Sequence, residues 1–349
     1  MSGDIHIRKE GRAGRITLTR PKALNALSYD MAMAIEAALD DWRDDEGVAL
    51  VLIDAEGDRA FCAGGDIQQL YDTGRAGDFA YGRRFWADEY RLNAKIARYP
   101  KPYVALMQGF VMGGGVGVSC HGSHRVVCES TQIAMPECGI GLVPDVGGSL
   151  LLARAPGRLG EYLGMTGTRM GAADAILAGF ADVYIPNLKW PDLTGRLLET
   201  GTTEAISELG EAAPQGGLSA LRPQVDAHFG GETLHDIVNS LRAADSDFAR
   251  DTLKTLARNS PLSMACAVEM IHRLRGPSAD IVRALGLEYR FTYRAMEQGD
   301  FLEGIRAAII DKDRKPQWKH GLDGLPGYAV SQMLRPLGKD ALTLEEETP

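Results

Sequence analysis

The sequence is poor in cysteine, has no long apolar run and carries no excess of positive charge. Its five cysteines are odd in number and lack C-x-x-C spacing, which excludes a disulfide framework and a cysteine-based zinc site. No stretch of about 18 apolar residues occurs, so a membrane-spanning helix is not expected. The net charge of −9 argues against a nucleic-acid partner and against an anionic membrane surface.

The first 20 residues also lack the features of targeting segments. They contain no apolar core of a secretory signal. Asp4 and Glu10 interrupt the region, and no amphipathic helix rich in Arg and Ser is present, so a mitochondrial presequence is not expected either. Together with the unpaired cysteines, these absences predict a cytoplasmic protein in a reducing compartment.

The first 200 residues alternate between strand-like and helix-like patterns. Short apolar runs bounded by turn residues predict strands at 5–9, 15–19, 48–53, 102–107, 125–128, 132–134 and 183–185. Helical spacing follows Ser28, which we expect to cap a helix, and recurs over residues 171–177. This alternation predicts an α/β domain over residues 1–200.

The second region, residues 201–349, has a different pattern. Residues 208–223 include Pro214, Gly216 and Gly217 and read as a loop. Almost everything that follows is helical in periodicity, with helices expected at 233–243, 248–256, 262–274 and 281–296. Asp300, with Glu303 three residues later, predicts a capping box at the start of one more helix.

A glycine run, Gly113-Gly114-Gly115, lies where a helix is expected to begin. It matches neither the G-x-G-x-x-G dinucleotide pattern nor the phosphate-loop pattern. It could serve only to let a helix pack close to a strand. The alternative is functional, because unpaired N–H groups at a helix start attract partial negative charge. The segment 61–67 could add a second backbone donor for an oxyanion.

Two carboxylates, Glu137 and Asp145, follow within about 30 residues. Each alone would pass for an acid in a loop or turn. Their spacing, with Gly139 and Gly141 between them, would let the loop fold back and bring both acids to one pocket. Apolar neighbours would raise the pKa of a carboxyl group by desolvation, which suits acid–base chemistry. Glu89, on an expected helix, would by itself be assigned to the solvent-facing side.

Other candidate groups are weaker. His121 and His124 lack a third ligand nearby, so we predict no metal site. Ser119 is not in a G-x-S-x-G context, which disfavours a nucleophile-elbow hydrolase. Cys138 could be a nucleophile, but no histidine is close in sequence, and a small buried apolar residue is the simpler interpretation.

The motifs 24–26, 61–66 and 112–115, in this order, resemble the crotonase (enoyl-CoA hydratase/isomerase) superfamily. The resemblance implies an α/β fold with a ββα superhelical core, here followed by a C-terminal all-helical extension. It also implies an acyl-CoA substrate, with CoA belonging to the substrate and no separate cofactor. The N–H groups of Gly65 and Gly114 match the oxyanion hole that binds the thioester carbonyl in this superfamily.

One position departs from the hydratases of the superfamily. Their first catalytic glutamate falls at Gly117 of this chain, which has no side chain. Within the superfamily the chain is most similar to the 3-hydroxyisobutyryl-CoA hydrolase branch, thioesterases of valine breakdown. The shared segments are 101–106, 112–117, 135–137, 144–148 and 304–313. This likeness implies catalytic roles for Glu137 and Asp145 and a substrate contact for Glu89.

Further residues are implied by the resemblance alone. They are expected to contact the CoA part of the substrate: Lys22, Ala23, Leu24, Ala63, Asp66 and Ile67. Three alternatives remain open, namely an enoyl-CoA isomerase, an enoyl-CoA hydratase and a non-catalytic CoA-binding protein. Superfamily members commonly form trimers, so a homo-oligomer is a candidate state.

Overall fold

The computed structural model describes residues 3–344 and divides into two compact units, each assembled from separate chain segments. The first contains residues up to Asp66, Arg91–Ala134 and Arg169–Ser219. The second contains Ile67–Tyr90, Met135–Thr168 and residues from Ala220 onward. These units are not the ranges 1–200 and 201–349, because two segments of the N-terminal range cluster with the C-terminal helices. As functional regions, those two ranges stay a prediction.

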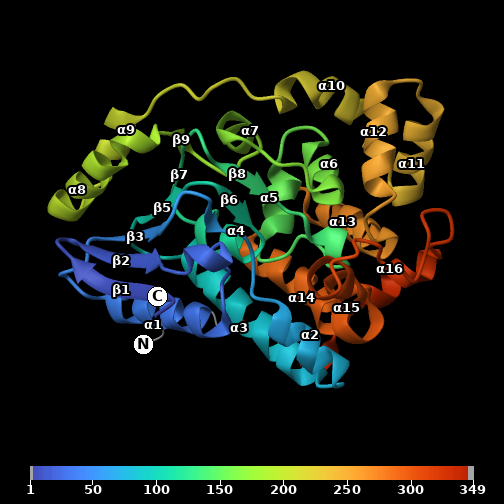
Figure 1. The fold of residues 1–349 in the computed structure, drawn as a ribbon, viewed down its shortest axis with the longest axis horizontal. Coiled ribbons are helices and arrows are strands. Elements are labelled where there is room, and N and C mark those ends of the chain that lie inside the picture. The colour runs from blue at the N-terminus through green and yellow to red at the C-terminus, as the bar shows by residue number, and fades with distance from the viewer. Residues whose placement is uncertain (1–2, 345–349) are drawn as a thin grey trace. The chain divides into compact units, whose positions relative to one another are not determined.

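The first unit contains a six-stranded sheet of order β1-β2-β3-β5-β7-β9 (Figure 1). Strands β1 and β2 pair antiparallel and form a hairpin, whereas every later pair of neighbours in this sheet is parallel. The strands are β1 (Ile5–Glu10), β2 (Ala13–Leu18), β3 (Leu50–Ala55), β5 (Tyr103–Met107), β7 (His124–Val127) and β9 (Val183–Tyr184).

A second, three-stranded sheet was not expected from the sequence. It has the order β4-β6-β8 and is parallel throughout. Its strands are β4 (Ala60–Cys62), β6 (Phe110–Met112) and β8 (Gln132–Ala134). Along the chain, β3, β5 and β7 of the large sheet are each followed by one strand of the small sheet and then by helical structure. This repeated ββα unit confirms the predicted α/β class and its superhelical connectivity.

Helices cover the large sheet of the first unit. On one face, Leu50, Leu52 and Val104 pack with Leu193 and Leu197, forming a buried apolar cluster beneath α8 and α9. Because successive side chains of a strand point to opposite faces of the sheet, the residues between those of this cluster lie on the other face. The helical elements of this unit are η1 (Pro21–Ala23), α1 (Tyr29–Arg43), α4 (Gly114–Ser119), α7 (Ala172–Leu177), η3 (Asn187–Lys189), α8 (Trp190–Thr200) and α9 (Glu204–Leu209). Ser28 caps α1 as predicted, accepting from the Met31 N–H group.

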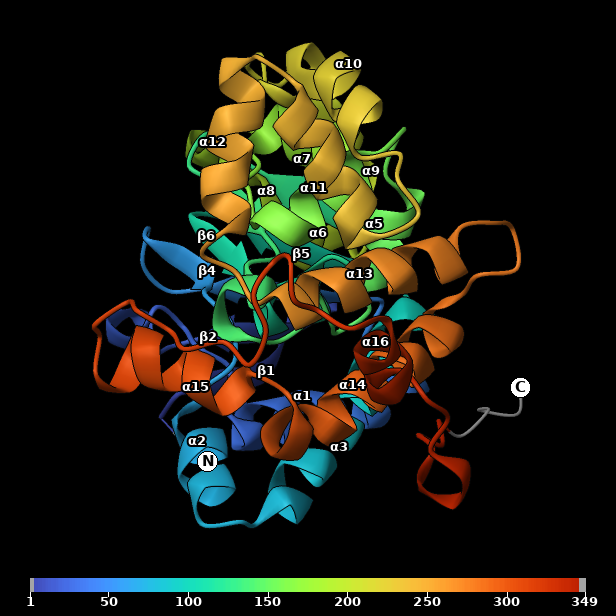
Figure 2. The same ribbon diagram turned by 90° about the vertical axis from the view of Figure 1, so that its right-hand side faces the viewer.

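Within its described residues the second unit is helical. Helices α11 and α12 run side by side, and α13 packs against α5, α6 and α14 (Figure 2). Its elements are α2 (Gln68–Arg75), η2 (Glu137–Ile140), α5 (Gly148–Arg154), α6 (Leu159–Thr166), α11 (Leu234–Ala243), α12 (Asp247–Leu256), α13 (Pro261–Leu274), α14 (Ile281–Gln298), α15 (Phe301–Ile305), the π-helical turn η4 (Arg306–Ile310), α16 (Gly327–Met333) and η5 (Gly338–Asp340). Helices α3 (Phe79–Ala97) and α10 (Leu218–His228) contribute residues to both units.

Two local predictions in this region were wrong. Residues 208–223 are not a loop throughout, because α10 starts at Leu218 and contains Pro223. Pro223 is the sixth residue of α10, so this helix lacks the N–H group that would bond to the carbonyl oxygen of Ser219. The capping box at Asp300 does not form: its carboxylate instead accepts from the Ser260 hydroxyl at 2.6 Å.

That displaced carboxylate helps to hold the short 3-10 helix η2. Ser260, the N-cap of α13, donates its N–H to the carbonyl oxygen of Cys138 at 2.9 Å while its hydroxyl reaches Asp300. At the start of α15, Gly304 lies so close that an added Cβ would be 2.0 Å from the carbonyl oxygen of Ile140. The C-terminal helices therefore fix the backbone of the segment that carries Glu137.

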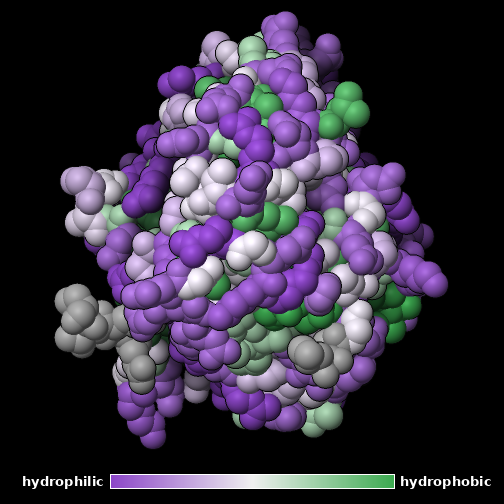
Figure 3. Space-filling model, turned by 90° about the vertical axis from the view of Figure 1, so that its left-hand side faces the viewer, coloured by the Kyte–Doolittle hydropathy of each residue, from purple (hydrophilic) through white to green (hydrophobic). Residues whose placement is uncertain are grey.

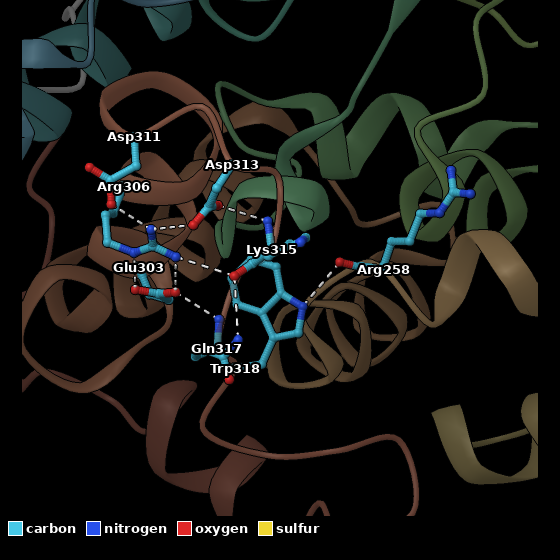
Figure 4. A network of polar contacts seen from close by, with 8 residues as sticks. All are labelled: Arg258, Glu303, Arg306, Asp311, Asp313, Lys315, Gln317 and Trp318. Atoms are coloured by element: carbon cyan, nitrogen blue, oxygen red, sulfur yellow. Dashed lines mark hydrogen bonds and ion pairs between the residues drawn. The ribbon is translucent and has the colours of Figure 1, made fainter.

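A network of polar contacts joins α15 to the segment that follows it (Figure 4). Arg306 pairs with Glu303, Asp311 and Asp313 at 2.6–2.8 Å. Several charge-assisted bonds to one guanidinium are stronger together than isolated surface pairs. The network stabilises the segment 303–313, whose sequence pattern contributed to the resemblance described above.

The molecular face in Figure 3 is largely hydrophilic, with scattered apolar areas. Among the described residues, the large apolar side chains with high exposure are Leu188, Ile309, Ile310 and Tyr328. No helix within residues 3–344 has the length and apolarity needed to cross a bilayer.

Candidate active site

The first unit places Gly65 and Gly114 just beyond the ends of two neighbouring strands. Gly65 follows β4 and Gly114 follows β6, and these strands are parallel, so their carboxyl ends meet at one sheet edge. Gly64 and Gly113 turn the chain there with φ values of +121° and +48°, which glycine adopts most readily. Within the described residues, neither the Gly65 nor the Gly114 N–H group has a hydrogen-bond acceptor.

Gly115 explains how the two donors can lie near each other. A Cβ atom at this position would be 2.3 Å from the carbonyl oxygen of Cys62. Only glycine therefore allows the start of α4 to pack directly on the end of β4. This contact supports the simple interpretation of the glycine run, close packing, and at the same time creates a pair of unpaired backbone donors. Such a pair suits a developing oxyanion.

The second unit buries three of the predicted acids. Glu89 on α3, Glu137 at the start of η2 and Asp145 before α5 are 5%, 4% and 4% exposed. The assignment of Glu89 to the solvent-facing side of its helix, which its local sequence by itself suggested, was wrong. Asp145 accepts a hydrogen bond from the Tyr90 hydroxyl at 2.9 Å. One carboxyl oxygen of Glu137, Oε2, is buried without a hydrogen-bond partner.

Burial changes the charge state of this group of acids. It raises the pKa of Glu89 to about 8, with the charge of Asp145 as a second cause. It raises the pKa of Asp145 to about 7, although the Tyr90 hydroxyl lowers it. The pKa of Glu137 is raised well above its usual range, first by burial and then by Asp145 and Glu288. Burial thus raises the pKa of all three carboxyl groups, and groups with raised pKa values are suited to acid–base or nucleophilic work.

The sequence profile of the enoyl-CoA hydratase/isomerase family matches residues 13–332. The chain belongs to this family. The predicted resemblance to the crotonase superfamily and the predicted crotonase-type fold are therefore confirmed.

Relatives in the family carry different names. The chain is 37% identical to the mitochondrial 3-hydroxyisobutyryl-CoA hydrolase of Gallus gallus, over 98% of this chain and 91% of the relative. It is 57% identical to a crystal structure described as an enoyl-CoA hydratase from Rhodobacter sphaeroides 2.4.1, with a TM-score of 0.94 over 97% and 99% of the two chains. A structure described as a carnitinyl-CoA dehydratase from Mycobacterium thermoresistibile is 40% identical, with a TM-score of 0.93 and 99% of each chain covered.

The residues predicted to contact CoA are only partly brought together. Ala63 donates its N–H to the Leu24 carbonyl at 3.0 Å, so these two segments are adjacent in the first unit. Lys22 and Ala23 are exposed on η1. Asp66 forms an ion pair with Arg20 at 3.2 Å. Ile67 precedes α2 in the second unit.

Two residues of the acid cluster escaped the sequence analysis. Tyr90 resembles any core aromatic, and nothing in its own pattern marks its bond to Asp145. Glu288 is fully buried on α14. It lies four residues from both Ala284 and Thr292, which are also buried, so helical periodicity could have placed it on the inner face. The sequence signal that could have identified Glu288 is therefore the position of an acid on the buried face of a helix.

The raised pKa values predict that the protein is less stable at pH 8 than at pH 5. Unfolded, Asp145 and Glu89 lose their protons near pH 4; folded, they keep them to about pH 7 and 8. Between these values the folded state binds more protons, so the free energy of unfolding falls as pH rises, by about 1.4 kcal/mol per pH unit and group. Urea unfolding at several pH values measures this slope, and Asp145→Asn should flatten it. A rise in stability over the same interval would contradict the assignment.

Proposed function

We propose that this protein hydrolyses the thioester of a short β-hydroxyacyl-CoA, with 3-hydroxyisobutyryl-CoA as the first candidate, to the free acid and CoA. The observation that carries the proposal is the cluster of three buried carboxyl groups, Glu89, Glu137 and Asp145, in a family that binds acyl-CoA. Curated relatives named 3-hydroxyisobutyryl-CoA hydrolase, 37% identical over nearly the full chain in the example above, support it. On the same proposal we assign the protein to valine catabolism.

The proposed reaction uses backbone and side-chain groups in separate roles. The N–H groups of Gly65 and Gly114 bind the thioester oxygen and stabilise the negative charge that develops on it. Glu137 either attacks the carbonyl carbon, forming a mixed anhydride that water then cleaves, or removes a proton from an attacking water. In both routes the C–S bond breaks and CoA leaves as the thiol.

Asp145 and Glu89 act beside Glu137 in this proposal. Either can orient the water or accept a hydrogen bond from the substrate hydroxyl. The CoA portion is assigned to the segments containing Lys22, Ala23, Leu24, Ala63, Asp66 and Ile67. Water is the only co-reactant, so the reaction as proposed needs no cofactor and no metal ion.

The name of the Rhodobacter structure favours a second candidate, an enoyl-CoA hydratase. Addition of water across a double bond uses two acid–base groups in the hydratases that this chain resembles. Gly117 cannot supply the first of them, because it has no side chain. An isomerase, which works with one acid at the position of Glu137, and a non-catalytic CoA-binding protein are further alternatives. Neither explains why three acids are buried together.

The deciding experiment uses purified protein at pH 8 with two substrates. Release of free thiol from 3-hydroxyisobutyryl-CoA is followed in parallel with loss of the enoyl absorbance of crotonyl-CoA. Thiol release without hydration supports the hydrolase. Hydration without thiol release supports the second candidate and overturns the first. Binding of CoA with turnover of neither substrate would favour the non-catalytic alternative.

We further propose that the protein is located in the cytoplasm and forms a homo-oligomer. The compartment rests on the features of the sequence, whereas the Gallus gallus relative is named as mitochondrial. Fractionation of the source cells tests the compartment, and light scattering in solution tests the number of subunits.

A further inference from the structure

Glu288 links helix α14 to the turn that carries Asp145. Its Oε2 atom accepts the N–H of Gly147 at 2.8 Å, and its Oε1 atom accepts the N–H of Ser149 at 3.1 Å. Oε1 also accepts the hydroxyl hydrogen of Ser149. All three donors belong to the start of α5, and the carboxylate is fully buried.

This carboxylate replaces the cap that α5 lacks. The N-cap residue of α5 is Gly147, which has no side chain to accept the free N–H groups of the first turn. Unsatisfied N–H groups at a buried helix start are costly, and an acid there is favoured by the partial positive charge. Glu288 therefore performs, from another helix, the function of a local Asp or Ser.

The turn in front of α5 needs such a support. Val146 has a φ of +51° and Gly147 a φ of +81°, so two successive residues are left-handed. For a β-branched residue this conformation is a strained outlier, which persists only where the surrounding contacts enforce it. The Gly148 N–H closes the turn by donating to the Asp145 carbonyl at 2.7 Å. The strained turn thus sits between Asp145 and the contacts made by Glu288.

We propose that Glu288 is a positioning residue for the reaction: through Gly147 and Ser149 it holds the strained turn that sets the orientation of Asp145 toward Tyr90. The inference rests on the proposed hydrolase function for its kinetic consequence. Its structural consequence, the placement of the Asp145 carboxylate, is independent of that function. Glu288 itself touches no reacting atom in this proposal.

The groups around Glu288 define what its removal should change. Asp145, Glu137 and Tyr90 are the titratable groups that interact with its charge. Replacing Glu288 by Gln keeps the shape, removes one acceptor and removes a carboxyl group whose pKa burial raises to about 8. The turn loses part of its support, and Glu137 loses a neighbour that opposes its ionisation.

The test compares Glu288→Gln and Ser149→Ala with Glu161→Gln. Glu161 is an equally buried acid of the second unit, paired with His272 and Arg275, so its variant controls for loss of a buried carboxylate. For Glu288→Gln we expect kcat to fall about 10- to 100-fold with KM within about threefold, as for a misplaced reacting group. Its acidic limb of kcat against pH should move to lower pH. Ser149→Ala should show a smaller fall in kcat, and Glu161→Gln should lower Tm without either change.

Unchanged kcat and an unchanged pH profile in Glu288→Gln would overturn the inference, as would a loss of kcat that Glu161→Gln reproduces at equal loss of Tm. Absence of thiol release by the wild type would defeat the proposed function alone. In that case a crystal structure of the Glu288→Gln or Ser149→Ala variant decides. A broken Tyr90–Asp145 hydrogen bond and a shifted turn support the positioning role, and an unmoved turn refutes it.

Discussion

Replacing Glu137 by Gln should lower thioester turnover about 10³-fold or more while leaving the affinity for CoA nearly unchanged. The amide has the size of the carboxyl group but can neither attack the carbonyl nor take a proton from water. General acid–base and nucleophilic groups contribute factors of this size, and 10³-fold corresponds to about 4 kcal/mol in the transition state. Oε2 of Glu137 has no hydrogen-bond partner to lose, so the structural cost of the change is small.

The stability of the same variant separates a catalytic from a structural role. Since burial disfavours the charge of Glu137, removing its ability to ionise should not lower Tm at pH 8. Turnover is measured by thiol release, CoA affinity by calorimetry and Tm by circular dichroism. If Glu137→Gln keeps more than about a tenth of wild-type turnover, or loses activity only in proportion to Tm, the role assigned to Glu137 is wrong.

A single-turnover reaction in ¹⁸O-labelled water tests for the nucleophilic route of Glu137. If water attacks the Glu137 carbonyl of the mixed anhydride, the label enters Glu137 and the bridging oxygen of Glu137 leaves in the product acid. If water attacks the substrate carbonyl, in the anhydride or in the thioester, the label appears in the product acid and the protein stays unlabelled, so label in Glu137 demonstrates the nucleophilic route. Mass spectrometry of the product and of the peptide containing Glu137 reads out both.

The local patterns of the first unit predicted most of its strands but not the second sheet. Alternation and apolar runs mark β1, β2, β3 and β5 because those strands have five or six residues and are buried in a large sheet. Of the strands of the second sheet, β8 was predicted at 132–134, but β4 and β6 were not, because three residues are too few for a period of two to be distinguished from a loop. Their existence follows from pairing between distant segments, which no local pattern contains.

Some residues of the candidate site could likewise be predicted from local sequence, and others could not. Glu137 and Asp145 could be named because glycine, proline and apolar neighbours surround them, and the predicted rise of their pKa values is confirmed. The burial of Glu89 depends on the packing of α3 and not on its neighbours in sequence. Tyr90 and Glu288 owe their importance to contacts across 55 and 139–141 positions of the chain.

Gly115→Ala should lower turnover about 100-fold or more, although helix propensity alone would predict a gain in stability. Ala is better than Gly inside a helix by roughly 1 kcal/mol. Here its Cβ would lie 2.3 Å from the Cys62 oxygen and 3.0 Å from the Cys62 Cβ, and neither atom can move without shifting β4. Separation of α4 from β4 displaces the Gly114 and Gly65 donors from each other.

The matched control is Gly195→Ala, in helix α8 of the same unit. No atom lies within 4 Å of the Cβ that it would add, so this variant should keep full turnover and gain slightly in Tm. Loss of one oxyanion donor typically costs roughly 10²- to 10³-fold in kcat, which sets the expected size for Gly115→Ala. If Gly115→Ala retains wild-type kcat with its fold intact, the close contact between α4 and β4 is dispensable. The oxyanion role of Gly65 and Gly114 would then lose its structural basis.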